Sequence, residues 1–127
     1  MHYLITGHTG FKGSWLSLIL IDAGAIVTGY ALPAEEKSNF RLLGLDSRMN
    51  SIEGNIKDKE HLKKALSDFQ PEIVFHLAAQ PIVSQSYIDP LDTFETNILG
   101  SANLLAAVAS VTSVRSLIYI TSDKCYE

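Results

Sequence analysis

Short apolar runs alternate along the chain with longer segments in which apolar residues recur at helical spacing. The runs are rich in Ile, Val and Tyr and end at polar or turn residues. Length and composition of this kind predict buried β-strands. We expect strands at residues 3–6, 26–30, 73–77 and 117–121, with a weaker one at 50–53.

Three segments between these runs predict helices. In residues 11–23, Trp15, Leu16, Ile19 and Leu20 recur at helical spacing, and Gly24 follows where a left-handed cap is needed. We therefore expect Trp15 and the other aromatic residues to be core material. Residues 58–69 repeat the pattern and end before Pro71. Residues 92–111 form the longest segment and are rich in alanine and leucine.

Strict alternation of strands and helices predicts an α/β fold with a doubly wound parallel sheet and helices on both faces. Parallel neighbours need long crossover connections, and the helices supply them. The segment 32–48 interrupts the rhythm, because Pro33, the acidic pair Glu35 and Glu36, and Asn39 are typical of a loop. A helical turn is expected within it, around residues 40–43.

Composition narrows the class of protein. The chain has 127 residues, 10 Lys plus Arg against 14 Asp plus Glu, a net charge of −4 and one cysteine, Cys125. This length supports one domain with its own core, and the 19% of charged residues argues against a disordered chain. The acidic balance argues against nucleic-acid or membrane-surface binding. A lone cysteine excludes an internal disulfide and any metal site built on several cysteines, and we expect no metal.

The longest apolar stretches of the chain are far shorter than the roughly 20 residues that span a bilayer. The first residues run directly into a strand and a glycine turn, without the basic start and apolar region of an export signal. We therefore expect a cytoplasmic protein.

Three glycines lie between the first predicted strand and the first predicted helix. Gly7, Gly10 and Gly13 fall at positions one, four and seven of the segment GHTGFKG. Glycines in this context allow a tight turn, close approach of a pyrophosphate to the backbone, and close packing of helix against sheet. The positive end of the helix then attracts phosphate. The placement predicts a Rossmann-like dinucleotide site, and the spacing is that of the short-chain dehydrogenase/reductase group.

The end of the second strand lacks the acidic residue that usually holds the adenosine ribose of NAD. Tyr30, Ala31 and Leu32 stand there instead. Glu35 and Glu36 follow soon after but are expected in a solvated loop. Arg41 is the nearest arginine and lies too far along the chain to indicate a 2′-phosphate site. The sequence favours NAD over NADP.

Further motifs resemble one family. The segments HLAAQP (76–81), TNILG (96–100) and TSDKCY (121–126), with GHTGFKGSWLS (7–17) and GYAL (29–32), resemble the NAD-dependent sugar-nucleotide epimerases and dehydratases, an extended branch of the short-chain group. Within that family the resemblance is to the 4,6-dehydratases that act on CDP-glucose. It covers nearly the whole chain. HLAAQP and the segment after the fifth strand carry most of the specificity.

The resemblance implies a redox-neutral lyase reaction. NAD takes hydride from C4 of the glucose unit, water leaves across C5 and C6, and hydride returns to C6, so that CDP-glucose becomes CDP-4-keto-6-deoxyglucose. By the same resemblance Ser122 bonds the C4 oxygen and Asp123 is the general acid toward the C6 hydroxyl. Lys124 is either the base at C5, if it is neutral, or an electrostatic stabiliser of the enolate.

The resemblance also implies a set of cofactor-binding residues. They are Gly7, Gly10, Phe11, Lys12, Gly13, Asn55, Ile56, Leu77, Ala78, Ala79, Gln80 and Thr96. We expect His76 to be a satisfied core histidine and Asn97 to tie the long helix to a neighbouring strand. Cys125 has no base beside it in the sequence, so a nucleophilic role is not expected.

One expected element of the family is missing. No tyrosine here is followed four positions later by a lysine, the pair that removes the hydroxyl proton in this group. We therefore expect the natural chain to continue beyond Glu127, and we expect the complete protein to form oligomers. On their own, residues 1–127 are expected to have a half-built NAD site, negligible activity and an unpaired edge on the fifth strand. The alternatives are another NAD-dependent sugar-nucleotide epimerase or dehydratase, or a non-catalytic NAD-binding module.

Overall fold

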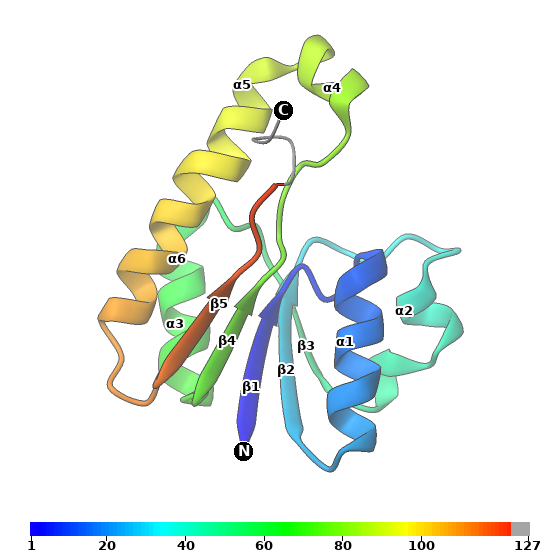
Figure 1. The fold of residues 1–127 in the computed structure, drawn as a ribbon, viewed down its shortest axis with the longest axis vertical. Coiled ribbons are helices and arrows are strands. Elements are labelled where there is room, and N and C mark those ends of the chain that lie inside the picture. Colours follow the sequence, from blue (N-terminus) through cyan, green and yellow to red (C-terminus); the bar gives the residue numbers. More distant parts are fainter. Residues whose placement is uncertain (123–127) are drawn as a thin grey trace.

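The described part of the chain contains a parallel sheet in the order β3-β2-β1-β4-β5 (Figure 1). The structure, a computed structural model, describes residues 1–122. Each neighbouring pair of strands is parallel. The five strands predicted from the sequence are confirmed, with bounds β1 (His2–Thr6), β2 (Ile26–Ala31), β3 (Asn50–Glu53), β4 (Ile73–His76) and β5 (Ser116–Tyr119).

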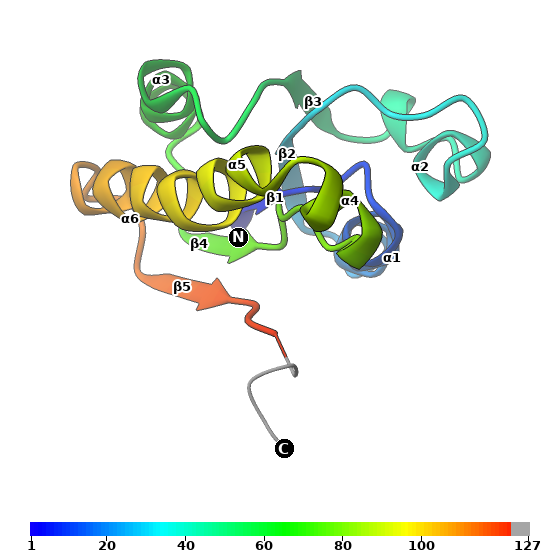
Figure 2. The same cartoon turned by 90° about the horizontal axis from the view of Figure 1, so that it is seen from above.

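Helices cover both faces of the sheet, as the alternating pattern predicted. From β1 the chain moves outward through β2 to β3, then crosses back to β4 and continues to β5. Because such crossovers are right-handed, the reversal puts α1 (Phe11–Asp22) and α2 (Asn39–Leu42) on one face. It puts α3 (Lys59–Phe69) and α6 (Gly100–Ala109) on the other, where they pack together (Figures 1 and 2). The order reverses between β1 and β4, which is where ligands bind in open sheets of this kind.

The main core lies between the sheet and the α3–α6 layer. Leu4, Tyr30 and Val74 from three strands meet Leu62 and Leu104 from the two helices, all at most 1% exposed. α3 begins where Asp58 accepts a hydrogen bond from the His61 amide, and it ends at Gln70 in a left-handed conformation before Pro71. This helix follows the sequence prediction closely, because the residues that cap its two ends are adjacent to it in the sequence.

The predicted inward face of α1 is wrong. Its buried residues are Gly13, Ser14 and Ser17, whereas Trp15 is 44% exposed and Ile19 62% exposed. The helix approaches so closely that a Cβ on Gly13 would collide with the Gly7 carbonyl oxygen. Small side chains therefore face the sheet, Trp15 and Ile19 face outward, and Leu16 and Leu20 are half-buried. The expectation that all aromatic residues are core material fails here, and also at Phe11, Tyr87 and Phe94.

The long helix predicted at 92–111 has three parts. They are α5 (Pro90–Phe94), a π-helical turn η2 (Glu95–Leu99) and α6. Asp89 caps α5 through its carboxylate, and Pro90 occupies the first turn, so the helix starts two residues before the predicted position. A short helix α4 (Val83–Ile88) and a 3₁₀ turn η1 (Leu45–Ser47) were not predicted. The helical turn expected near Phe40 is present as α2.

Candidate functional site

Gly7 leaves β1 in a conformation that requires glycine. Its φ is +75°, its amide donates to the Tyr30 carbonyl oxygen at 2.9 Å, and a Cβ would lie 2.8 Å from the Ala78 nitrogen. The loop from β1 is therefore in backbone contact with the segment that follows β4. This contact lies at the point where the strand order reverses.

The loop ends at the N-terminus of α1, where its geometry leaves room for an anion. Gly10 precedes the helix with extended backbone, and a Cβ there would meet only the Gly7 carbonyl oxygen, at 3.3 Å, with open space beyond. The first amides of a helix, here those of Phe11, Lys12 and Gly13, have no partner within it and point outward. Phe11 and Lys12 are exposed. The open position beside free amides fits the phosphates of a dinucleotide.

The segment Leu77 to Gln80, across the reversal point, is held at both ends. The amides of Leu77 and Ala78 donate to Thr6 Oγ1 at 3.2 and 3.3 Å, and the Leu77 amide also donates to the Thr6 carbonyl oxygen at 3.1 Å. The Gln80 amide donates to Asn97 Oδ1 at 2.8 Å, and Asn97 Nδ2 donates to the Gln80 carbonyl oxygen at 3.1 Å. Asn97 thus binds the long helical segment by hydrogen bonds, as predicted, but its partner is the loop beyond β4 and not the strand itself.

Gln80 itself stabilises a turn. Its side chain accepts a bond from the Ile82 amide and donates to Thr93 Oγ1 and the Ile82 carbonyl oxygen. Ala79, between the anchored positions, is exposed. The backbone of this segment, rather than the Gln80 amide group, therefore lies beside Gly7.

His76 is buried at the end of β4, and both of its ring nitrogens have partners. Nδ1 lies 2.7 Å from Thr6 Oγ1 and Nε2 lies 3.1 Å from Ser101 Oγ. Burial lowers the pKa of His76 to about 4, so the ring is neutral at physiological pH. The prediction of a satisfied core histidine is confirmed.

His8, inside the glycine loop, was not singled out from the sequence. Its ring is 1% exposed, contacts Phe40 edge-on at 5.1 Å between centroids, and places Nε2 2.7 Å from Ser51 Oγ. Burial lowers its pKa to about 4, with a smaller opposite effect from the Tyr30 backbone. His8 therefore anchors the loop to β3 and α2 through a neutral ring. The only sequence signal was its place between Gly7 and Gly10.

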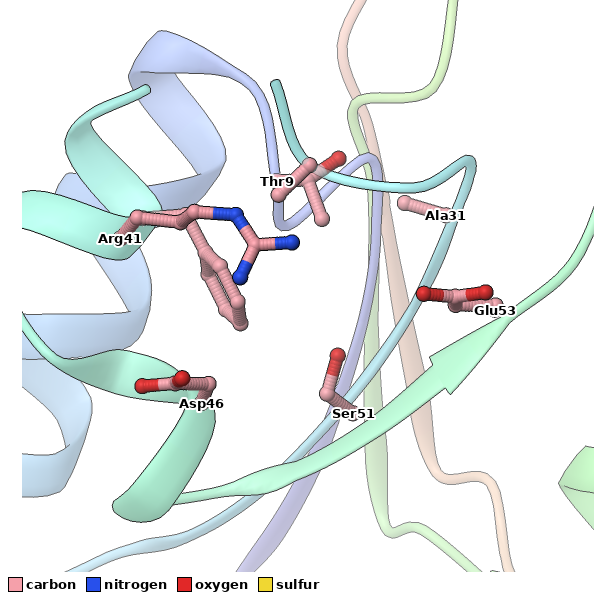
Figure 3. Close-up of a pocket in the computed structure, with 8 residues that line it drawn as sticks. Thr9, Ala31, Arg41, Asp46, Ser51 and Glu53 are labelled. Atoms are coloured by element: carbon pink, nitrogen blue, oxygen red, sulfur yellow. The ribbon is translucent and has the colours of Figure 1, made fainter. Parts of the chain in front are cut away.

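A pocket of about 290 Å³ lies beside the loop at the end of β2 (Figure 3). Thr9, Ala31, Arg41, Asp46 and Glu53 line it, with Ala34, Phe40 and Ser51. The expectation that Arg41 is too remote from β2 is wrong, because α2 folds back beside the glycine loop. Glu53 is the register partner of Ala31, so a carboxylate reaches this end of β2 from the neighbouring strand.

Tyr30, which stands where an acidic residue is usual, points to the opposite face of the sheet. Its hydroxyl donates to the Asn55 carbonyl oxygen at 3.1 Å, and burial raises the pKa of Tyr30 to about 12. It belongs to the main core. The tyrosine is therefore unable to replace the acidic group at the rim of the sheet.

The residues expected around the adenine lie after β3. Asn55 Oδ1 accepts a bond from the Lys57 amide at 2.9 Å. Ile56 is 5% exposed and lies under Gly100, where a Cβ would collide with it. Lys57 Nζ pairs with Asp92 at 2.7 Å and Glu95 at 3.3 Å. This loop is thus tied to α5 and to η2, the turn that carries Thr96.

Ser122 lies just beyond β5 at the same rim and is exposed. Asp123, Lys124 and Cys125 lie outside the described residues. Within residues 1–122 no group of three or more His, Cys, Asp or Glu is arranged to hold a metal ion. In the same range no helix is long and apolar enough to cross a membrane.

The family model for GDP-mannose 4,6 dehydratase matches residues 4–126. The chain belongs to the GDP-mannose 4,6 dehydratase family. A CDP-glucose 4,6-dehydratase of Salmonella typhimurium is 51% identical over 124 residues, which are 97% of this chain and 34% of that protein. The chain therefore spans about a third of the length of the curated relative.

Solved structures of epimerases share the fold of this chain. A UDP-glucose 4-epimerase of Stenotrophomonas maltophila, with bound NAD and formylated UDP-arabinopyranose, matches with TM-score 0.84 and 25% identity over 98% of this chain and 38% of its own. A UDP-glucose 4-epimerase of Thermus thermophilus in complex with NAD matches with TM-score 0.74 and 33% identity over 84% of this chain and 33% of its own. This member of the GDP-mannose 4,6 dehydratase family has a Rossmann-like fold, as predicted.

Proposed function

We propose that the protein binds NAD in a crevice at the rim of the sheet, beside the contact between Gly7 and Ala78, and that, in its full-length form, it converts CDP-glucose to CDP-4-keto-6-deoxyglucose. The observation that carries the proposal is the 51% identity with a CDP-glucose 4,6-dehydratase over 97% of this chain. The open glycine cradle at the reversal of the strand order supports the cofactor part of the proposal. The two NAD-bound epimerases that share the fold support it as well.

The chain's own residues bind and orient the cofactor. The amides of Phe11, Lys12 and Gly13 hold the pyrophosphate, and the absence of a Cβ at Gly10 leaves space for it. Leu77, Ala78 and Ala79 border the crevice and Gln80 holds their segment in place, while Asn55, Ile56 and Thr96 form the adenine side. NAD, when bound, supplies a hydride acceptor and donor.

The pocket beside β2 supports NAD rather than NADP. Arg41 is its one positive group, against the two carboxylates of Asp46 and Glu53, so the side chains that line it carry a net negative charge. An added 2′-phosphate is repelled by such a lining, whereas a ribose hydroxyl can donate to a carboxylate. Glu53 thereby supplies the acidic group that the end of β2 lacks.

The residues after β5 carry the proposed chemistry. Ser122 donates a hydrogen bond to the C4 oxygen while C4 loses hydride and the C4 hydroxyl passes its proton to the tyrosine base that the family resemblance implies for the full-length protein. Lys124 removes the C5 proton or, if charged, stabilises the enolate. Asp123 gives a proton to the departing C6 hydroxyl, which leaves as water. Hydride returned to C6 and a proton returned to C5 complete a reaction without net oxidation.

A second substrate class has support from the comparisons. Both solved structures compared above are UDP-glucose 4-epimerases. The alternative is therefore a sugar-nucleotide epimerase or dehydratase that acts on a nucleotide other than cytidine diphosphate.

Mass spectrometry of full-length protein incubated with NAD and either CDP-glucose or UDP-glucose tests the proposal. We expect loss of one water from CDP-glucose, with one solvent deuterium incorporated when the reaction runs in heavy water. Ser122→Ala is expected to lower kcat at least tenfold with NAD uptake unchanged. Reaction with UDP-glucose alone supports the alternative. NAD uptake without reaction of either sugar indicates a non-catalytic module, and no uptake rejects the proposal entirely.

A further inference from the structure

Hydrogen-bond donors and acceptors around Ser101 determine the proton position on His76. The Ser101 hydroxyl has one proton, which it donates to the Asn97 carbonyl oxygen at 2.6 Å. Tyr119 donates its own hydroxyl proton to Ser101 Oγ, also at 2.6 Å. The remaining partner, His76 Nε2 at 3.1 Å, must then be a donor. His76 therefore carries its proton on Nε2.

This assignment determines the direction of every bond on the other side of the ring. With Nε2 protonated in the neutral ring, Nδ1 is an acceptor, so Thr6 donates its hydroxyl proton to Nδ1. The Thr6 oxygen then offers its lone pairs to the amides of Leu77 and Ala78. A proton on Nδ1 instead would turn the Thr6 proton toward these two amides, which are donors themselves.

The bonds form one connected path from β1 to the far end of the segment 77–80. Thr6 holds its first two amides, and Asn97, whose carbonyl oxygen accepts from Ser101, holds both backbone groups of Gln80. His76 joins the two anchors through Thr6 and Ser101. Gly7 packs on the same segment, with a Cβ position 2.8 Å from the Ala78 nitrogen.

We propose that the Nε2-protonated ring of His76 is a positioning residue for the dinucleotide. It acts through the Thr6 hydroxyl to orient the Ala78 amide, and it adds to the bond that the Thr6 carbonyl oxygen makes with the Leu77 amide. The segment beside Gly7 is thereby kept ready for the cofactor. This inference rests on the proposed function, because the segment 77–80 is where we place NAD. His76 itself touches no reacting atom.

A pair of matched variants separates positioning from stability. Thr6→Val preserves the shape of the side chain but removes the hydroxyl, whereas Thr6→Ser keeps it. In full-length protein we expect Thr6→Val to raise the Kd for NAD about tenfold, the equivalent of one net hydrogen bond, and Thr6→Ser to change it less than about threefold. Calorimetric titration well below the melting temperature of each variant gives these values.

Two variants at His76 extend the test. The side-chain carbonyl of His76→Asn can still accept from Thr6, while His76→Leu offers no acceptor. We expect Asn to retain most of the NAD affinity and Leu to lose about as much as Thr6→Val. Nitrogen-15 NMR of the unsubstituted protein, which requires no variant to fold, is expected to show the neutral ring of His76 with its proton on Nε2.

The outcomes are distinguishable from failure of the proposed function. A proton on Nδ1, or a Thr6→Val variant that loses thermal stability but binds NAD as tightly as the unsubstituted protein, overturns the positioning role even if NAD binds. An unsubstituted protein that takes up no NAD overturns the proposed function and the positioning role together, although the NMR result would still establish the direction of the bonds.

Discussion

The imidazole ring of His8 fills the space that a Cβ on Gly29 would occupy. The glycine loop and the middle of β2 are therefore matched in shape: a large, buried ring lies opposite the residue without a side chain. His8 also contacts Ser51 and Phe40, so the ring connects the loop to β2, β3 and α2. Two positions 21 residues apart in the sequence thus depend on each other.

Gly29→Ala is expected to lower the free energy of unfolding by about 1–3 kcal/mol, because the added methyl group collides with the His8 ring. Urea denaturation measures the loss. The matched control is the same change in a His8→Ala background, where the ring is absent and the cost should fall by more than half. Equal costs in the two backgrounds would mean that the ring is not the obstacle.

Stability is expected to fall as the pH decreases from about 6.5 to 4. Burial lowers the pKa of both His8 and His76 to about 4, so between these values the unfolded chain binds protons that the folded chain excludes. Each ring contributes a slope of up to about 1.4 kcal/mol per pH unit. Below pH 4 both states are protonated and this contribution becomes constant.

Unfolding free energies from urea titrations between pH 7 and 4.5 test this slope. His8→Gln removes one of the two rings and should reduce the slope by up to one proton's contribution, with the carboxylate contributions unchanged. An identical slope in this variant and in the unsubstituted protein would contradict a neutral, buried His8.

Gly10→Ala and Gly13→Ala are expected to fail in different ways. A Cβ on Gly13 collides with the Gly7 carbonyl oxygen, so this variant should lose stability. A Cβ on Gly10 meets only that same oxygen, at 3.3 Å, and otherwise enters open space. The free energy of unfolding of Gly10→Ala should therefore lie within about 1 kcal/mol of that of the unsubstituted protein. The methyl group would occupy the space proposed for the pyrophosphate.

NAD titration of the folded Gly10→Ala protein provides the measurement. We expect a Kd at least tenfold higher than that of the unsubstituted protein. Unchanged affinity would show that the phosphates are not bound against Gly10.

Ser17→Leu is expected to be more damaging than Ile19→Gln, contrary to what hydropathy alone predicts. Ser17 is fully buried against the sheet and its hydroxyl donates to the Gly13 carbonyl oxygen at 2.8 Å, whereas Ile19 is 62% exposed. Overpacking at Ser17 should cost about 1–3 kcal/mol, while the change at Ile19 should stay within about 0.5 kcal/mol. Thermal unfolding of the two variants compares their losses of stability directly. A larger loss for Ile19→Gln than for Ser17→Leu would mean that the apolar side chains of α1 do face the sheet.

Local signals account for what was predictable. Strand and helix positions follow from side-chain spacing, and the caps at Asp58, Gln70 and Gly24 involve residues adjacent to the helices they end. The glycine loop was recognisable because its function depends on backbone geometry, which glycine spacing expresses directly. The helical start at Asp89 and Pro90 is equally local, but it precedes the apolar pattern that predicts the helix, so the predicted start lies two residues too late.

The amino-acid sequence by itself determined the alternating α/β order, the glycine turn after the first strand and the family motifs, because each depends on residues close together in the chain. Only the tertiary structure decided which face of α1 packs on the sheet, that α2 brings Arg41 to the end of β2, that His8 lies against Gly29, and which hydroxyl groups meet the two ring nitrogens of His76. These features depend on distances between segments far apart in the chain. Spacing of apolar residues shows that a surface will be buried, but the atoms that bury it, and the donors and acceptors they bring, are known only once the chain has folded.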